Sequence, residues 1–218
     1  MRIATWNVER LKHRRELDKI LLACTQADAD ILVLTETDER VNLCYHTIIR
    51  TPKLTEIAPK YYKPTENRVS IFTRYKCLRQ FPTYDKYTAL CAELETEKGN
   101  LLVYGTIIGI YGNRNENFKT DLPKQIEDFK RLSAGHNLCV CGDYNLTFSD
   151  NYYHTEEGRN AINECFSQIG MRILTAERPC CVDHIALPDR LIAGSTVTTQ
   201  EWNLDKSLSD HKGIVVEF

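Results

Sequence analysis

The sequence lacks the glycine-rich loops that bind nucleotide phosphates. Neither GxxxxGK[ST] nor GxGxxG occurs, which excludes the common nucleotide-motor and dinucleotide-binding folds. A GxSxG turn is also missing, so nothing supports a serine hydrolase. No uncharged apolar run approaches the roughly 18 residues of a membrane span. The stretch Met1–Asn7 has no secretory apolar core, so we expect a cytoplasmic protein without a membrane partner.

An excess of charge of either sign is missing as well. The chain carries 28 Lys and Arg against 30 Asp and Glu, so there is no whole-molecule positive field for wrapping nucleic acid. Its nine cysteines include no CxxC pair, and we expect reduced, mostly buried thiols rather than a zinc site or disulfides. The 218 residues suffice for a single domain, 1–218, and nothing indicates an obligate protein partner.

One segment, residues 60–86, is locally basic and aromatic. Its cations are Lys60, Lys63, Arg68, Arg74, Lys76, Arg79 and Lys86. Its rings are Tyr61, Tyr62, Phe72, Tyr75, Phe81 and Tyr84. Cations interleaved with rings suit a nucleic-acid backbone with splayed bases, which makes Arg68 and Arg74 candidate substrate-binding residues. A solvated strand face over half-buried aromatics explains the segment equally well.

Hydrophobic periodicity predicts more strands than helices, in mixed order. The expected strands are 2–7, 31–35, 69–73, 88–95, 101–108, 138–141, 182–187, 192–198 and 213–218. The expected helices lie around 17–24, from Asp121 to 132, and around 161–169 with Gly170 as the C-terminal cap. Residues 37–67 are expected to form loop with at most a short helix. Two packed sheets with helices outside accommodate this order.

Polar residues follow several of the expected strands directly. They are Asn7, Glu9, Glu36, Asp143, Asn145, Asp183, Asp210 and His211. Each alone could be a turn or capping residue, and His184 is better explained as a core or surface histidine. Together they predict a cluster, because carboxylates gather only around a cation or a shared proton. Oxygen ligands of this kind suit Mg²⁺ (or Mn²⁺), and the inventory describes metal-assisted hydrolysis of a phosphate ester.

These residues sit in motifs that occur in a recognisable order. The motifs are Thr5-Trp6-Asn7-Val8-Glu9, Leu34-Thr35-Glu36-Thr37, Gly142-Asp143-Tyr144-Asn145, Val182-Asp183-His184-Ile185 and Ser209-Asp210-His211. The ordered set resembles the endonuclease/exonuclease/phosphatase superfamily, which includes abasic-site endonucleases and DNase I. The resemblance spans the chain from Thr5 almost to its end. It implies an α/β fold, a four-layer α/β/β/α sandwich of two mixed β-sheets, with a divalent-metal site at one rim.

The resemblance also implies a role for each residue. Glu36 would be the principal metal ligand, helped by Asn7, Glu9 and Asp210. Asp143 would orient or deprotonate the attacking water with Asn145 as its partner, and His211, oriented by Asp183, would stabilise the phosphate. Many relatives place a His or Tyr after the central strand, where it contacts the phosphate. This chain has Ile107 and Ile108 at that place. The phosphate contact is therefore vacant or shifted to Tyr111, Asn113 or Arg114.

The expected function is therefore metal-dependent hydrolysis of phosphodiester bonds in DNA or RNA, with nucleic acid as partner and a 5′-phosphate product. A phosphatase or phosphodiesterase for a small phosphate ester is the first alternative, favoured by the near-neutral charge and the short chain. A catalytically silent binding module with the same fold is the second.

Overall fold

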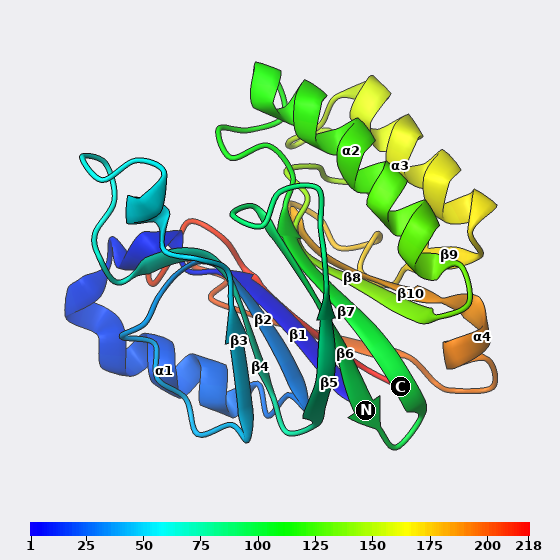
Figure 1. Cartoon of the computed structure of the whole chain (residues 1–218), viewed down its shortest axis with the longest axis horizontal. Helices are drawn as coiled ribbons and strands as arrows, with labels where there is room; N and C mark the ends of the chain where they lie inside the picture. The colour runs from blue at the N-terminus through cyan, green and yellow to red at the C-terminus, as the bar shows by residue number, and fades with distance from the viewer.

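The computed structural model describes all 218 residues, and its strands form two six-stranded mixed sheets that pack face to face (Figure 1). The first sheet has the order β11 (Thr198–Trp202), β12 (Gly213–Glu217), β1 (Arg2–Asn7), β2 (Ile31–Asp38), β4 (Glu66–Thr73), β3 (Thr47–Arg50). The second has the order β5 (Lys76–Phe81), β6 (Ala89–Thr96), β7 (Gly99–Ile107), β8 (Asn137–Asp143), β10 (Asp183–Pro188), β9 (Met171–Ile173).

Helices form the two outer layers (Figure 1). α1 (Leu17–Gln26) covers the first sheet, and α2 (Glu116–Ser133) and α3 (Glu156–Gln168) cover the second. The remaining helical turns are η1 (Glu9–Leu11), η2 (Arg14–Glu16), η3 (Leu54–Glu56) and α4 (Asp189–Ile192). The expected four-layer α/β/β/α sandwich is confirmed. No helix combines the length and the apolar character that a bilayer crossing requires.

The central strands are apolar on both sides because both of their faces are covered. Ile31 and Val33 of β2 point into the core between the sheets, whereas Leu32 and Leu34 point toward Ile20 of α1. A strand covered on both faces loses the polar half of its pattern. The cysteines behave as small core residues: no disulfide forms, and six thiols are buried, those of Cys24, Cys91, Cys139, Cys141, Cys165 and Cys181.

Some predicted element boundaries were wrong. α2 begins at Glu116, not at Asp121, because the Asn115 side chain caps the helix by accepting from the Asn117 amide. Phe118 continues the apolar stripe one turn ahead of Leu122, and that spacing was the missed signal.

The strand expected at 192–198 is not formed. Ile192 ends α4, and β11 starts only at Thr198. Gly194 lies between them with a φ of +78°, a conformation that stops a helical turn. β3 and η3 lie in the expected loop 37–67, and β5 and β9 were not expected either. These three edge strands are short, with 4, 6 and 3 residues for β3, β5 and β9, so the sequence gives little pattern to recognise.

Register places the polar strand ends at one rim of the sandwich. β1 is parallel to β2, with Asn7 opposite Thr35, so Glu36 follows beside the end of β1. β8 is antiparallel to β10, with Asp143 directly opposite Asp183. The two chain termini lie together at the other end, where the N-terminal amine of Met1 donates to the Phe218 carbonyl over 2.8 Å (Figure 1).

Candidate active site

One hydrogen bond joins the two sheets at this rim. Asn7, the last residue of β1, donates from Nδ2 to Oδ2 of Asp143, the last residue of β8, over 3.1 Å. The Asn7 amide is fixed at its other end, because Oδ1 accepts from the Glu9 backbone N–H at 2.9 Å. Both side chains are buried, so this bond sets the relative position of the two strand ends.

Asp143 owes its position to the glycine before it. Gly142 has a φ of +143°, and a Cβ there would collide with the backbone oxygen of Thr106 on β7. Asp143 Oδ1 accepts from the Asn145 amide at 2.9 Å. Burial raises the pKa of Asp143 to about 7, with the charge of His211 opposing the rise and that of Asp183 adding to it. A carboxyl with this pKa can exchange a proton near neutrality.

His211 is held against two carboxylates. Its Nδ1 lies 2.6 Å from Asp183 Oδ2, and its Nε2 lies 4.0 Å from Asp143 Oδ2. Burial alone would lower the pKa of His211, but the charges of Asp183 and Asp143 outweigh it and raise the pKa to about 10. The imidazole is therefore a cation at neutral pH.

The loop that carries His211 is fixed to the end of β1. Ser209 Oγ donates to the Asn7 carbonyl at 2.6 Å, and Trp6 Nε1 donates to the His211 carbonyl at 3.0 Å. Neither contact was expected from the sequence, although both residues belong to the quoted motifs. His211 cannot move away from Asn7 without breaking them.

Glu36 adopts a left-handed backbone conformation with a φ of +45°, as do Glu9 at +50° and Asn145 at +53°. Such conformations cost roughly 1–3 kcal/mol in non-glycine residues and gather at functional sites. Burial raises the pKa of the Glu36 carboxyl, and the charges of Arg68 and then His211 oppose the rise. The Glu36 carboxylate therefore lies within electrostatic range of His211, at the same rim.

The donor set at the rim fits a hard cation held by few protein ligands. No group of three His, Cys, Asp or Glu side chains is arranged to enclose a metal ion. Mg²⁺ commonly uses only one or two carboxylates and completes its shell with water and substrate phosphate. Glu36 offers such a carboxylate, because its side chain is half-buried and lies in the field of Arg68 and His211.

The other two expected metal carboxylates, Glu9 and Asp210, differ in how free they are to bind a cation. Glu9 Oε1 lies 2.5 Å from Lys12 Nζ, and Glu9 Oε2 accepts from the Asp210 amide at 3.3 Å. The charge of Glu9 is thus already compensated by Lys12. Asp210 is more available: its side chain is 63% exposed, and its Oδ1 lies 3.6 Å from His211 Nε2.

Asn145 and Asn113 hold the backbone around the site. Asn145 Nδ2 donates to the carbonyls of Ile108 and Gly109, at 3.1 and 2.9 Å. Asn113 is buried and donates to the Asn145 carbonyl at 2.8 Å. Asn113 was expected to contact substrate, but its side-chain amide instead holds the Asn145 backbone in place.

Tyr111 and Arg114 lie beside the rim on the loop after β7. Tyr111 is 70% exposed and lines a hollow of about 280 Å³ that also contains His211. The expected site residues Asn145 and Asp210 also line this hollow. Sequence reasoning missed Tyr152, Tyr153, Lys206 and Lys212, which complete the lining on one side. The doublet Tyr152-Tyr153 within an otherwise polar loop was the signal that could have found it.

The basic and aromatic segment 60–86 does not form one surface. Arg68 is buried, and its guanidinium donates to the Tyr62 hydroxyl at 3.2 Å near Glu36. Arg74 lies at the other end of β2 and β4, about 20 Å away by strand rise, where it pairs with Asp28 and Asp30. The structure brings Arg68 to the rim and leaves Arg74 beside the chain termini.

His184 is a core residue, as expected. It is fully buried and bonded to Thr175 Oγ1 at 2.8 Å and to the Leu146 carbonyl at 2.9 Å. Burial lowers its pKa to about 4, so the ring is neutral in the folded protein.

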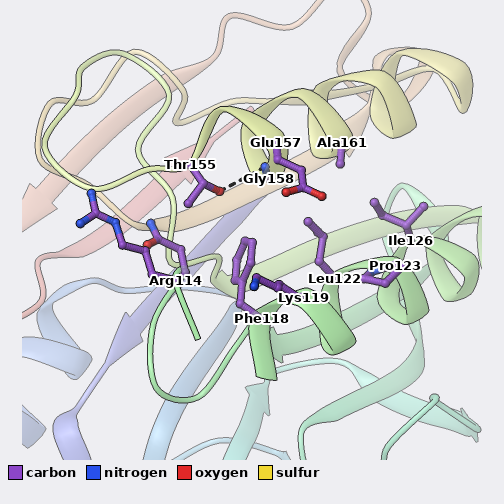
Figure 2. A pocket seen from close by; sticks show the side chains of 11 residues that line it. Arg114, Phe118, Lys119, Leu122, Pro123, Ile126, Thr155, Glu157, Gly158 and Ala161 are labelled. Carbon is purple, nitrogen blue, oxygen red and sulfur yellow. Dashed lines mark hydrogen bonds between the residues drawn. The ribbon is translucent and has the colours of Figure 1, made fainter. Parts of the chain in front are cut away.

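A second hollow, of about 360 Å³, lies between α2 and α3 (Figure 2). The Phe118 ring and Leu122 form its apolar floor, and Arg114, Lys119 and Glu157 stand around it. It contains none of the carboxylates of the rim, so we assign no chemistry to it.

The fold recurs in solved structures, although no family model matches the sequence and no curated protein matches it. A 3′ phosphatase, NExo from Neisseria, bound to a product DNA hairpin, superimposes with a TM-score of 0.72 at 18% identity, covering 100% of this chain and 99% of that one. An AP endonuclease from Archaeoglobus fulgidus gives 0.72 at 15% identity, with 100% and 99% covered.

A third match is the AP endonuclease LMAP from Leishmania major, with a TM-score of 0.72 at 14% identity over 99% of this chain and 86% of that one. Identities this low carry the fold alone, but the similarity extends over the entire chain, and an endonuclease/exonuclease/phosphatase protein from Beutenbergia cavernae also matches, over 99% of it, with a TM-score of 0.67. The chain therefore has the DNase I-like sandwich fold of the endonuclease/exonuclease/phosphatase superfamily, as its ordered motifs predicted.

Proposed function

We propose that this protein is a metal-dependent phosphoesterase that hydrolyses phosphodiester bonds in nucleic acid and leaves a 5′-phosphate. The observation that carries the proposal is the buried network Asn7–Asp143–His211–Asp183, which places a carboxyl with a pKa of about 7 next to an imidazolium. Solved structures with this fold include nucleases and a DNA 3′ phosphatase, which supports phosphoester chemistry.

Asp143 is suited to receive a proton from an attacking water. Asn7 and the Asn145 amide each donate to one of its oxygens, so the carboxylate is oriented while one lone pair on each oxygen stays available. In the reaction the water oxygen bonds to phosphorus, its proton passes to Asp143, and the bond from phosphorus to the 3′ oxygen breaks. The 3′ oxygen leaves as a hydroxyl after taking up a proton from solvent.

His211 is suited to neutralise charge on a non-bridging phosphoryl oxygen. Asp183 fixes the ring through Nδ1, which leaves Nε2 pointing toward the solvent side between Asp143 and Asp210. A fixed cation of this kind stabilises a phosphorane-like transition state more than the ground state. Glu36, with Asn7 and Asp210 nearby, would hold Mg²⁺ (or Mn²⁺), which supplies further positive charge to the phosphate when bound.

Incubation with single- and double-stranded DNA and RNA tests the proposal directly. Cleavage in Mg²⁺, its loss in EDTA and a 5′-phosphate on the product are the expected results. Absence of metal-dependent cleavage of every polymer would contradict it.

A small phosphate ester is the second candidate substrate. The hollow beside His211 measures only about 280 Å³, close to the lower limit for small-molecule sites. Phosphate release from mononucleotides or inositol phosphates, with no cleavage of polymers, would favour this candidate. A silent binding module is the weakest of the three, because the network retains a charged His211 and an acid with a shifted pKa.

A further inference from the structure

Three exposed tyrosines surround the approach to His211. Tyr111 is 70% exposed, Tyr152 57% and Tyr153 37%. Large exposed aromatic side chains gathered at one place mark a binding surface rather than a folding requirement. We call Tyr111, Tyr152, Tyr153 and Lys206 the tyrosine platform.

The platform separates two hollows of equal size. The first, of about 280 Å³, contains His211 and Lys206; the second, also about 280 Å³, contains Arg114 and His154. All three tyrosines line both hollows. A chain that extends from the reaction centre into the second hollow therefore has to pass along these rings.

The loop that carries two of the rings is ordered by its own hydrogen bonds. Tyr152 N donates to Asp150 Oδ1 at 3.0 Å, and Tyr153 N donates to Thr147 Oγ1 at 3.3 Å. Asp150 also accepts from the Cys180 amide at 2.6 Å, which ties the loop to the turn before Asp183. The backbone that carries the two rings is therefore ordered, which lowers the conformational entropy lost when a ligand binds them.

A close contact on the Tyr111 side adds to this order. Gly112 has a φ of +95°, and a Cβ there would meet the Tyr153 hydroxyl. The turn that carries Tyr111 thus lies against the Tyr153 hydroxyl, and its positive φ favours glycine at position 112.

The charges beside the rings favour a polyanion. Lys206 Nζ lies 5.2 Å from the centre of the Tyr152 ring and 3.3 Å from the Tyr152 hydroxyl. Lys206 forms no ion pair with a carboxylate. Lys212 contributes less, because Glu201 lies 3.3 Å from its Nζ. Asp210 is the only acidic residue that lines the first hollow.

We propose that the tyrosine platform binds unpaired nucleotides next to the scissile phosphate, so that the substrate is a single-stranded or frayed nucleic acid. This inference rests on the proposed function and narrows its substrate class. Bases can stack on the rings only when they are unpaired, and Lys206 and Arg114 can then contact the flanking phosphates. Each hollow is large enough for about one nucleotide.

Binding without turnover tests the platform. Fluorescence anisotropy in EDTA would measure Kd for labelled octamers of thymidylate and of uridylate, and for a blunt DNA hairpin. We expect both single strands to bind more tightly than the hairpin, and the two octamers separate DNA from RNA preference. Tyr152→Ala should raise Kd for the preferred octamer about tenfold, the usual effect of removing one stacking ring.

Matched variants separate stacking from other effects. Tyr152→Phe keeps the ring and loses only the contact with Lys206, so its Kd should stay within about threefold of the parent. Leu22→Ala removes a side chain of similar exposure, 55%, on α1 and should leave Kd unchanged. Tighter binding of the hairpin, or equal Kd values for Tyr152→Ala and Leu22→Ala, would overturn the platform.

Hydrolysis of bis(p-nitrophenyl) phosphate by the parent protein in Mg²⁺ keeps the two proposals distinguishable, because this diester has no base to stack. Hydrolysis together with failed binding tests would reject the platform and keep the phosphoesterase. Single-strand binding that depends on Tyr152, without hydrolysis of any phosphoester, would reject the phosphoesterase and keep the platform.

Discussion

Replacing Asp143 with Asn should reduce activity and stabilise the fold at the same time. The carboxyl is buried, and its pKa is raised from 3.8 to about 7. A raised pKa means that the folded state holds the proton more tightly than the unfolded state. The stabilising contribution of Asp143 is therefore fully present below pH 3.8 and is lost as the pH rises to 7.

The size of the effect follows from the two pKa values. Each pKa unit corresponds to about 1.36 kcal/mol. Ionisation of Asp143 therefore lowers the free energy of unfolding by about 4 kcal/mol at pH 8, and by roughly 1.5 kcal/mol at pH 5. An asparagine avoids this cost and gives up one of the two hydrogen bonds that Asp143 accepts, worth about 1 kcal/mol. We therefore expect the variant to be about 2–3 kcal/mol more stable than the parent at pH 8 and nearly equal to it at pH 5.

Urea unfolding in EDTA at both pH values measures the stability, and hydrolysis of a phosphodiester in Mg²⁺ measures activity, which should fall ~10²-fold or more. If Asp143→Asn lowered the free energy of unfolding by the same amount at pH 8 and at pH 5, the electrostatic account would be refuted. Full activity in a folded variant would refute the assignment of Asp143 as proton acceptor.

Three further substitutions address the cation, the phosphate contact and the core. Glu36→Gln should raise the Mg²⁺ concentration needed for half-maximal activity by about tenfold or more, seen in a metal titration, and an unchanged requirement would remove Glu36 from the metal site. His211→Gln should lower kcat by ~10²-fold or more with circular dichroism unchanged, whereas a loss explained by unfolding would point to a structural role. His184→Gln addresses acid stability: the pKa of His184 is lowered from 6.5 to about 4, so its contribution is present above pH 6.5 and is lost as the pH falls toward 4. Between pH 7 and pH 4.5 the parent should lose about 2 kcal/mol of unfolding free energy that the variant does not lose, and parallel losses in urea titrations would contradict this.

The central strands and the rim could be predicted because each signal is local. The runs 2–7 and 31–35 are apolar on both faces, and the polar residues that follow them identify the strand ends. The edge strands β3, β5 and β9 could not be found, because they have only 4, 6 and 3 residues, too few to establish a period of two. The register of the strands decides whether motifs far apart in the sequence meet in one cluster. This register depends on strand pairing across the whole chain.

The sequence could not predict which hydrogen-bond and ion-pair partners the side chains of the site would have. Glu9 and Asn113 belong to the right neighbourhood, yet Glu9 is paired with Lys12, and Asn113 donates to the Asn145 carbonyl. Arg74 directly follows the strand that contains Arg68, and it lies at the other end of that strand. Which donor meets which acceptor depends on rotamers and burial, which only the assembled fold determines.

The Asn7–Asp143 hydrogen bond makes the reaction centre part of the seam between the two halves of the sandwich. Any sliding of one sheet over the other would stretch this bond first, and it would tilt the carboxylate that has to accept the proton. Packing far from the rim, in the shared interior that includes Val33 and Val103, thereby sets the alignment of the proton acceptor. A slightly looser interior would show itself in slower turnover well before the molecule lost its shape.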